Sequence, residues 1–186
     1  MKKLLLVLLI ACTSAFAQVS SVTRNPASYT QDVFAYKGSR ILQVDEVSSP
    51  GNEENVFIFS KVEKFAKPDV MYFQRFTKNG GLWKLGGFLE IRHDGIISTT
   101  NNRKSFTDVD KNKSIDALFI YALNDADLKQ QSIHLLFSQG SKIHSIAAVK
   151  SDNYTSSKFS DNFSELSPNV KNAVMAYWNK LDKADK

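Results

Sequence analysis

Apolar and polar residues alternate in short runs along most of the chain, between about residues 32 and 149. Because successive side chains of a strand point to opposite faces, each run with this period of two predicts a strand. The runs recur at roughly ten-residue spacing with no helical pattern between them, which indicates antiparallel hairpins. The expected strands lie within 32–36, 40–47, 55–65, 70–76, 87–98, 115–123 and, as a pair, 132–149.

Tight-turn residues stand between several of these runs. Asn79-Gly80 separates two strand-forming runs, and both residues tolerate positive φ, so this pair is a strong hairpin signal. Asp94-Gly95 is a second candidate turn, and the segment 139–141 is a third. These turns support a chain of sequential hairpins.

One run, Ile115–Leu123, is apolar on both of its faces. A strand with this pattern is typically covered on both sides, whereas an exposed strand alternates with polar residues. We therefore expect this segment to be a central strand with packed side chains above and below it.

The period changes from two to that of a helix near the C-terminus. Apolar residues recur there at the spacing of a single helical stripe: Val170, Val174, Tyr177, Trp178 and Leu181. Ser167 suits the N-cap and Pro168 the first helical position, which predicts a helix over about 168–181. The predicted fold is mainly β: a single antiparallel β-sheet domain of hairpins, residues 32–186, with one C-terminal amphipathic helix packed on it. A polar linker or N-terminal arm, residues 18–31, precedes it.

The first 17 residues read as a secretory signal peptide. Lys2 and Lys3 precede a short apolar run, and an A-x-A site ends at Ala17. The run is too short to cross a bilayer, so we expect no transmembrane segment. The protein is then expected to be exported, to the periplasm, the outer envelope or the extracellular space of a bacterium. An alternative is lipoprotein processing, with Cys12 as a lipid-anchored residue.

Composition narrows the chemistry that the mature chain can perform. Cys12 is the only cysteine, so cleavage after Ala17 leaves no disulfide, no thiol nucleophile and no cysteine zinc site. With 42% hydrophobic and 11% aromatic residues, the composition is that of a globular protein. The formal charge of +5 falls when Lys2 and Lys3 leave, and the other lysines are interleaved with acids. A nucleic-acid partner is therefore not expected.

The best chemical lead is an acidic loop before the apolar run at 115–123. Oxygen-bearing residues occupy every second position of this loop, as in a calcium loop: Asp108, Asp110, Asn112, Ser114 and Asp116. Three carboxylates, an amide and a carbonyl would suit calcium, a hard cation that prefers oxygen ligands. Lys113 replaces the usual glycine and Phe119 the usual closing glutamate, so the loop is not an EF-hand. The alternative is a polar turn whose side chains satisfy their own backbone. In either case we expect a structural role.

No other pattern nominates a catalytic site. His134 and His144 would lie on opposite faces of the last hairpin if a two-residue turn joins its strands, so they would not share a metal. His93 is expected at a turn. Tyr72, Trp83 and Tyr121 are candidates for a sugar-stacking platform, with core packing as the alternative. A carboxylate pair for glycan hydrolysis stays open, because such residues can be far apart in the chain.

The order of motifs in the second half resembles a family of small exported bacterial proteins labelled as surface polysaccharide biosynthesis proteins. The corresponding segments, GLWKL at 81–85, TDVDKNKSIDALFIY at 107–121, LFSQGSKIHSIAA at 136–148 and NAVMAYWNKL at 172–181, fall within 79–181. That family has a DxDxNG-type loop, from which Lys113 departs. The resemblance implies an envelope role and no established enzymatic activity.

Three functions follow as hypotheses. The first is a non-enzymatic exported envelope protein, calcium-stabilised and linked to surface polysaccharide. The second is a periplasmic immunity or inhibitor protein that neutralises a secreted toxin or lytic enzyme, and the third is an envelope glycan-active enzyme. The expected partners are accordingly polysaccharide, another envelope protein or a secreted effector.

Overall fold

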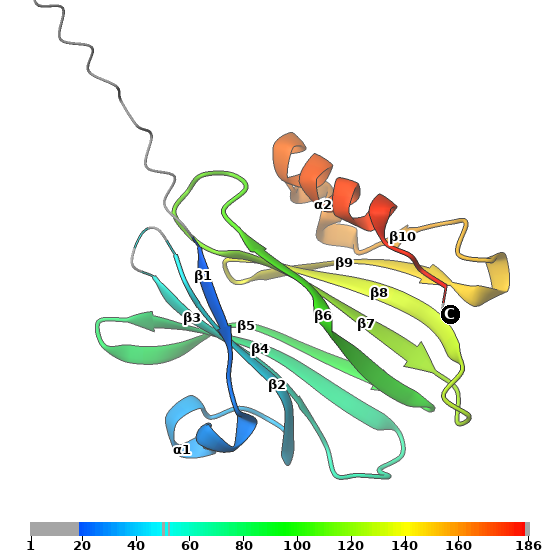
Figure 1. Cartoon of the computed structure of the whole chain (residues 1–186), viewed down its shortest axis with the longest axis horizontal. Helices are drawn as coiled ribbons and strands as arrows, with labels where there is room; N and C mark the ends of the chain where they lie inside the picture. Colours follow the sequence, from blue (N-terminus) through cyan, green and yellow to red (C-terminus); the bar gives the residue numbers. More distant parts are fainter. Residues whose placement is uncertain (1–18, 50, 52, 185–186) are drawn as a thin grey trace, which may run out of the picture.

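The computed structural model describes residues 19–184 except 50 and 52, and the predicted signal peptide and Cys12 therefore lie outside the described residues. The described chain forms two five-stranded antiparallel sheets (Figure 1). The first, called the N-sheet, contains β1 (Ser20–Thr23), β2 (Arg40–Ser48), β3 (Glu54–Lys61), β4 (Asp69–Asn79) and β5 (Leu82–His93) in that order. The second, called the C-sheet, contains β6 (Ile96–Thr107), β7 (Asp116–Asn124), β8 (Gln130–Gln139), β9 (Lys142–Val149) and β10 (Lys158–Phe159). The predicted mainly β fold with antiparallel pairing is confirmed.

The two sheets pack face to face around a core rich in phenylalanine. Phe73 of β4 and Phe119 of β7 contact each other, and each contacts both Phe57 and Phe59 of β3. The ring centres in these contacts are 5.0 to 6.1 Å apart. These residues follow the period of two that places alternate side chains of each strand on the same face. Aromatic pairs at this separation add to the stability that burial provides.

β7 is buried on both faces, as its sequence predicts. Ala117, Phe119 and Tyr121 face the N-sheet, while Leu118 and Ile120 belong to the cluster beneath the C-terminal helix. The strand lies between β6 and β8 in the C-sheet. Its two apolar faces therefore join the two main parts of the core.

The helix α2 (Pro168–Lys180) covers the outer face of the C-sheet (Figure 1). Val170, Val174 and Trp178 are buried against Leu135 and Ile146 of the sheet, among others. The Trp178 indole donates from Nε1 to Ser157 Oγ at 2.8 Å, so its polar atom is satisfied. The predicted C-terminal amphipathic helix is confirmed.

Four short helical segments of the described chain lie in the connections between the strands and before α2. They are η1 (Pro26–Ser28), α1 (Gln31–Phe34), η2 (Lys150–Asp152) and η3 (Asp161–Glu165). The prediction of a strand at 32–36 is wrong, because this segment forms α1, and Phe34 packs beneath the N-sheet with Tyr29 and Phe76. Residues 20–23 of the predicted arm pair with β2 as the edge strand β1.

The turns sort to two opposite ends of the molecule, because neighbouring strands are antiparallel. One end, called the acidic-loop end, carries the β2–β3 loop, the β4–β5 turn at Gly80-Gly81, the 108–115 loop and the β8–β9 turn. The other, called the cavity end, carries the β3–β4 loop, the Asp94-Gly95 turn and the β7–β8 loop. The β4–β5 turn has φ of +60° at Gly80 and +85° at Gly81, so it lies one residue beyond the predicted Asn79-Gly80 pair.

The Asp94-Gly95 turn passes the chain from one sheet to the other rather than closing a hairpin. β5 pairs with β4 and β6 pairs with β7, so the two strands beside this turn belong to different sheets. The described part of the chain contains no helix with the length and apolar character that a membrane crossing requires.

Candidate functional site

The acidic loop folds around the carboxylate of Asp108. Its Oδ1 accepts from the backbone N–H of Asn112 at 2.9 Å, and its Oδ2 accepts from that of Lys113 at 3.0 Å. Lys113 has a φ of +71°, the left-handed conformation that glycine adopts without strain. The chain thus turns at Lys113 although the residue is not glycine.

The other side chains of the loop bind within the loop and to β8. Asn112 donates from Nδ2 to Asp110 Oδ2 at 3.0 Å and accepts from the N–H of Ser114 at 2.7 Å. Gln139 of β8 donates to Asp110 Oδ2 at 3.1 Å. These contacts are those of a polar turn whose Asp and Asn side chains satisfy the backbone.

Asp116 closes the loop at the start of β7 and is 1% exposed. Its Oδ2 accepts from the N–H of Val109 at 3.2 Å. The pKa of its carboxyl is raised to about 7, mainly by burial. The charges of Asp110 and Asp108 act in the same direction, whereas the Val109 N–H and Arg75 oppose the shift. The acidic loop therefore places two negative charges near the carboxyl group of Asp116, which burial already shields from water.

Arg75 of β4 connects this loop to both sheets. Its guanidinium donates to Asn55 Oδ1 at 2.9 Å, to Glu53 Oε1 at 2.9 Å and to the carbonyl of Gly140 at 3.1 Å. A longer contact of 3.4 Å reaches Ser114 Oγ in the acidic loop. Burial lowers the pKa of the guanidinium, while the nearby Glu53 and Asp116 charges favour its charged form.

Calcium binding at this loop stays a prediction. Carboxylate and amide oxygens suit a hard cation, and the left-handed Lys113 makes the turn that a calcium loop needs. Within the described residues, however, no group of three or more His, Cys, Asp or Glu side chains is arranged to hold a metal ion. Bound calcium would therefore require Asp108 and Asp110 to exchange hydrogen bonds with the loop for contacts with the ion.

The histidines have separate surroundings. Gly140 and Ser141 form a two-residue turn, so His134 and His144 point to opposite faces of the C-sheet. His134 stacks on Tyr121 with ring centres 4.7 Å apart, and burial lowers its pKa to about 4. The buried His144 bonds the carbonyl of Asn162, and His93 bonds that of Asn124 beside the turn. Each ring is held by packing or by a backbone group.

Two of the three aromatic candidates lie on one outer surface. Tyr72 of β4 stacks with Phe88 of β5, at 6.1 Å between ring centres, on the outer face of the N-sheet. Trp83, farther along the same hairpin, packs against Phe34 with ring centres 5.2 Å apart. Tyr121 instead lies in the core between the sheets and is not available to a ligand.

A second candidate site is a hollow at the cavity end, where the sequence predicted no site. This hollow, called the basic cavity, has a volume of about 450 Å³. Four cationic and two acidic side chains line it, together with small residues and an aromatic ring: Arg40, Lys61, Lys64, Phe65, Ala66, Lys67, Asp69, Asp94, Gly95, Ile96 and Ala126. The sequence contains one indication of this site, the basic run KVEKFAK at 61–67. The strand predicted to extend to residue 65 included most of this run, whereas β3 ends at Lys61 and the rest forms a loop.

The floor of the basic cavity is fixed by a buried ion pair. The Lys61 ammonium donates to the Asp69 carboxylate and, at 2.9 Å, to the carbonyl of Ile97. Asp69 also accepts from the N–H of Ile97 at 2.8 Å. These contacts join the two sheets and neutralise the Lys61 charge, so the unpaired cations of the cavity are at its rim.

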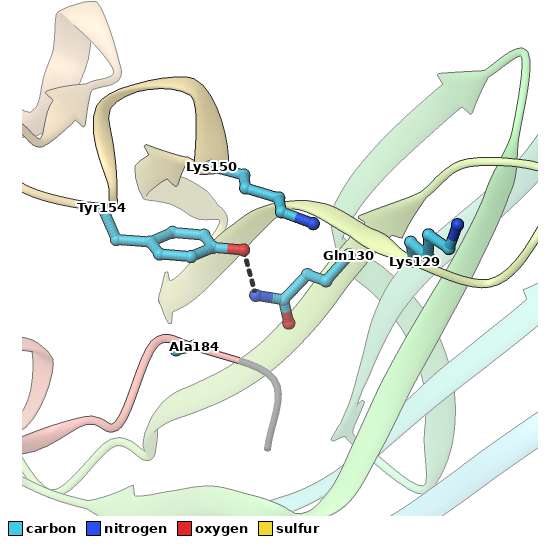
Figure 2. A pocket seen from close by; sticks show the side chains of 5 residues that line it. All are labelled: Lys129, Gln130, Lys150, Tyr154 and Ala184. Carbon is cyan, nitrogen blue, oxygen red and sulfur yellow. Dashed lines mark hydrogen bonds between the residues drawn. The ribbon is translucent and has the colours of Figure 1, made fainter.

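A smaller hollow of about 220 Å³ lies at the same end, between β8, η2 and the C-terminal segment (Figure 2). Lys129, Gln130, Lys150, Tyr154 and Ala184 line it. Gln130 donates to Tyr154 Oη at 3.0 Å and to the carbonyl of Lys183 at 2.7 Å. The Gln130 side chain in this hollow is therefore already engaged in holding the C-terminal segment.

Comparison of the chain with protein-family models, with curated proteins and with solved structures gave no match. The resemblance to exported surface polysaccharide proteins therefore stays a prediction.

Proposed function

We propose that this protein is an exported, non-catalytic component of the bacterial envelope that binds surface polysaccharide. The basic cavity supports this proposal most directly, because its volume of about 450 Å³ lies within the roughly 300–1,000 Å³ of small-ligand pockets. Its rim combines hydrogen-bond donors with the exposed ring of Phe65, and sugars need both polar partners and an apolar surface to pack against.

Binding of purified surface polysaccharide to the exported protein tests this proposal. We expect binding that Phe65→Ala weakens at least ten-fold and that Phe159→Ala, an exposed phenylalanine on β10, leaves unchanged. Deletion of the gene should alter the surface sugar. Absence of polysaccharide binding together with a normal capsule would refute the proposal.

Calcium would act as a structural part of this protein. Asp108, Asp110, Asn112, Ser114 and Asp116 would hold it at the acidic-loop end, opposite the basic cavity. A bound divalent cation would offset the charge repulsion that contributes to the raised pKa of Asp116. The ion would hold the acidic loop against the start of β7 and would take part in no chemical step.

A second candidate function is that of an inhibitor or immunity protein, which the edge strand β5 favours. Leu82, Leu85 and Phe88 are 69%, 53% and 37% exposed on this strand. Apolar side chains on an unpaired edge can form a protein interface. Two findings would support this function: a neighbouring gene that encodes a secreted effector, and co-purification of the protein with that effector. Leu85→Asp should abolish the co-purification. Absence of both findings would exclude the function. Glycan hydrolysis stays an untested alternative.

A further inference from the structure

We propose that the basic cavity selects acidic sugars, with the anionic group at Arg40, Lys64 and Lys67 and the sugar ring on Phe65. This inference rests on the proposed function and names the ligand class of the same site. It concerns sugars that carry a carboxylate or a phosphate, in contrast to neutral sugars of the same shape.

The charges at the rim are the first reason. Arg40, Lys64 and Lys67 are exposed, and none forms an ion pair with a described residue. The Arg40 side chain donates from Nε to the carbonyl of Val62, at 3.3 Å. Of the two acids in the lining, Asp69 is engaged by Lys61, which leaves Asp94 as the one unpaired acid of the lining. The rim therefore has an excess of positive charge that no ion pair with a described residue neutralises.

Phe65 is the second reason. Its side chain is 85% exposed, the most exposed large hydrophobic residue described, and its φ is +72°. A bulky residue in the left-handed conformation is rare, and exposure of its ring to water is unfavourable. The Lys64 ammonium lies 4.9 Å from the ring centre, so a cation and an aromatic face are presented together.

The rigid floor is the third reason. The Lys61–Asp69 pair and its two bonds to Ile97 anchor both the start of β4 and the start of β6. The β3–β4 loop that carries Lys64, Phe65 and Lys67 is thus attached at each end to a fixed strand. A site that is formed before the ligand arrives loses less entropy on binding.

Titration calorimetry with matched ligands tests the proposal. Trigalacturonate carries carboxylates, and its methyl ester has the same rings without charge; glucose 6-phosphate and glucose form a second pair. We expect each acidic member to bind at least ten-fold more tightly than its neutral partner, with a preference that shrinks between 50 and 500 mM salt. The two pairs distinguish carboxylate from phosphate as the source of the anion.

Variants then locate the site. Lys64→Ala with Lys67→Ala should weaken acidic-sugar binding at least ten-fold and leave neutral-sugar binding unchanged. The control, Lys84→Ala with Lys158→Ala, removes the same net charge from exposed positions that do not line the cavity, and should leave the affinity unchanged. Asp94→Asn should tighten binding of acidic sugars several-fold by removing the unpaired acid.

The outcomes separate this inference from the function on which it rests. Equal binding of acidic and neutral sugars, lost in Phe65→Ala, would overturn the charge selectivity but keep polysaccharide binding. Equal weakening by both double lysine variants would overturn the location, since only net charge would then matter. If none of the four ligands binds, the inference is overturned. The proposed function is then decided separately, by the assay with whole polysaccharide.

Discussion

Arg75 Nη1 donates to the backbone carbonyl of Gly140 at 3.1 Å and so joins a strand of the N-sheet to a turn of the C-sheet. The same guanidinium donates to Asn55 of β3 and to Glu53 of the adjoining β2–β3 loop. A planar fork of donors can satisfy several acceptors at once, which a lysine ammonium cannot do in the same geometry. The contact therefore depends on arginine at this position.

Arg75→Met should destabilise the protein by about 3–5 kcal/mol, because it leaves buried acceptors without their donor. Chemical denaturation measures the loss. Arg92→Ala is a suitable control, since its ion pair with Glu90 is largely exposed and should contribute at most about 1 kcal/mol. Equal effects of the two substitutions would contradict the assigned role of Arg75.

Calcium should raise the melting temperature if the acidic loop binds it, with an affinity of about 10⁻⁴–10⁻³ M. Differential scanning fluorimetry with and without calcium measures this shift. Asp110→Ala should abolish it, whereas Asp127→Ala, an exposed acid on the β7–β8 loop, should not.

Lys113→Gly should tighten calcium binding, because glycine adopts the positive φ of this position without the side-chain penalty of about 1–2 kcal/mol. The same fluorimetry over a calcium titration measures the change. No shift in either the natural protein or this variant would rule out the calcium site.

The pH dependence of stability should carry a contribution from His134. Its pKa is lowered from 6.5 to about 4 by burial, so the unfolded chain binds the proton more readily than the folded one. The stabilising effect is complete above pH 6.5 and falls as the pH decreases towards 4, by about 3 kcal/mol in total.

His134→Gln isolates this effect. Asp116, with its raised pKa, changes stability in the opposite direction over part of this range, and subtracting the variant's curve from that of the natural protein removes its contribution. We expect the difference in unfolding free energy to shrink from pH 7 to pH 4. A constant difference would show that His134 does not titrate in this way.

Gly95→Ala should be strongly destabilising, by about 1–3 kcal/mol or more, because a Cβ at this position would lie 2.0 Å from the Asn124 carbonyl oxygen. Gly86→Ala is the matched control, since its nearest contact, Thr77 Oγ1, would be at an ordinary 3.5 Å. Thermal melts of the two variants compare them directly, and similar losses would mean that the close approach is relieved without cost.

The elements that the sequence predicts well are those with a strong period of their own. The two-faced run at 115–123 became the buried strand β7, and the stripe from Val170 to Leu181 became α2. Segment 32–36 has a strand-like alternation, yet a single helical turn places Phe34 against Phe76, since packing outweighs weak local preference.

The candidate site was less predictable for a physical reason. The basic cavity combines residues from the start of β2, the β3–β4 loop, the Asp94-Gly95 turn and the β7–β8 loop, and only the folded chain brings these together. Arg75 likewise reads as a polar residue within a strand, and its bond to Gly140 depends on the packing of the two sheets. The acidic loop was visible because its residues are contiguous.

The passage of the chain between sheets at Asp94-Gly95 divides the protein into two consecutive halves, each with a complete set of strand pairings. A peptide-bond break at this turn would interrupt no hydrogen-bonded ladder. The halves 18–94 and 95–186, produced as separate polypeptides, should therefore assemble through the phenylalanine-rich interface and the bonds of Arg75. The basic cavity would then be complete only when both fragments associate, because residues of both halves line it.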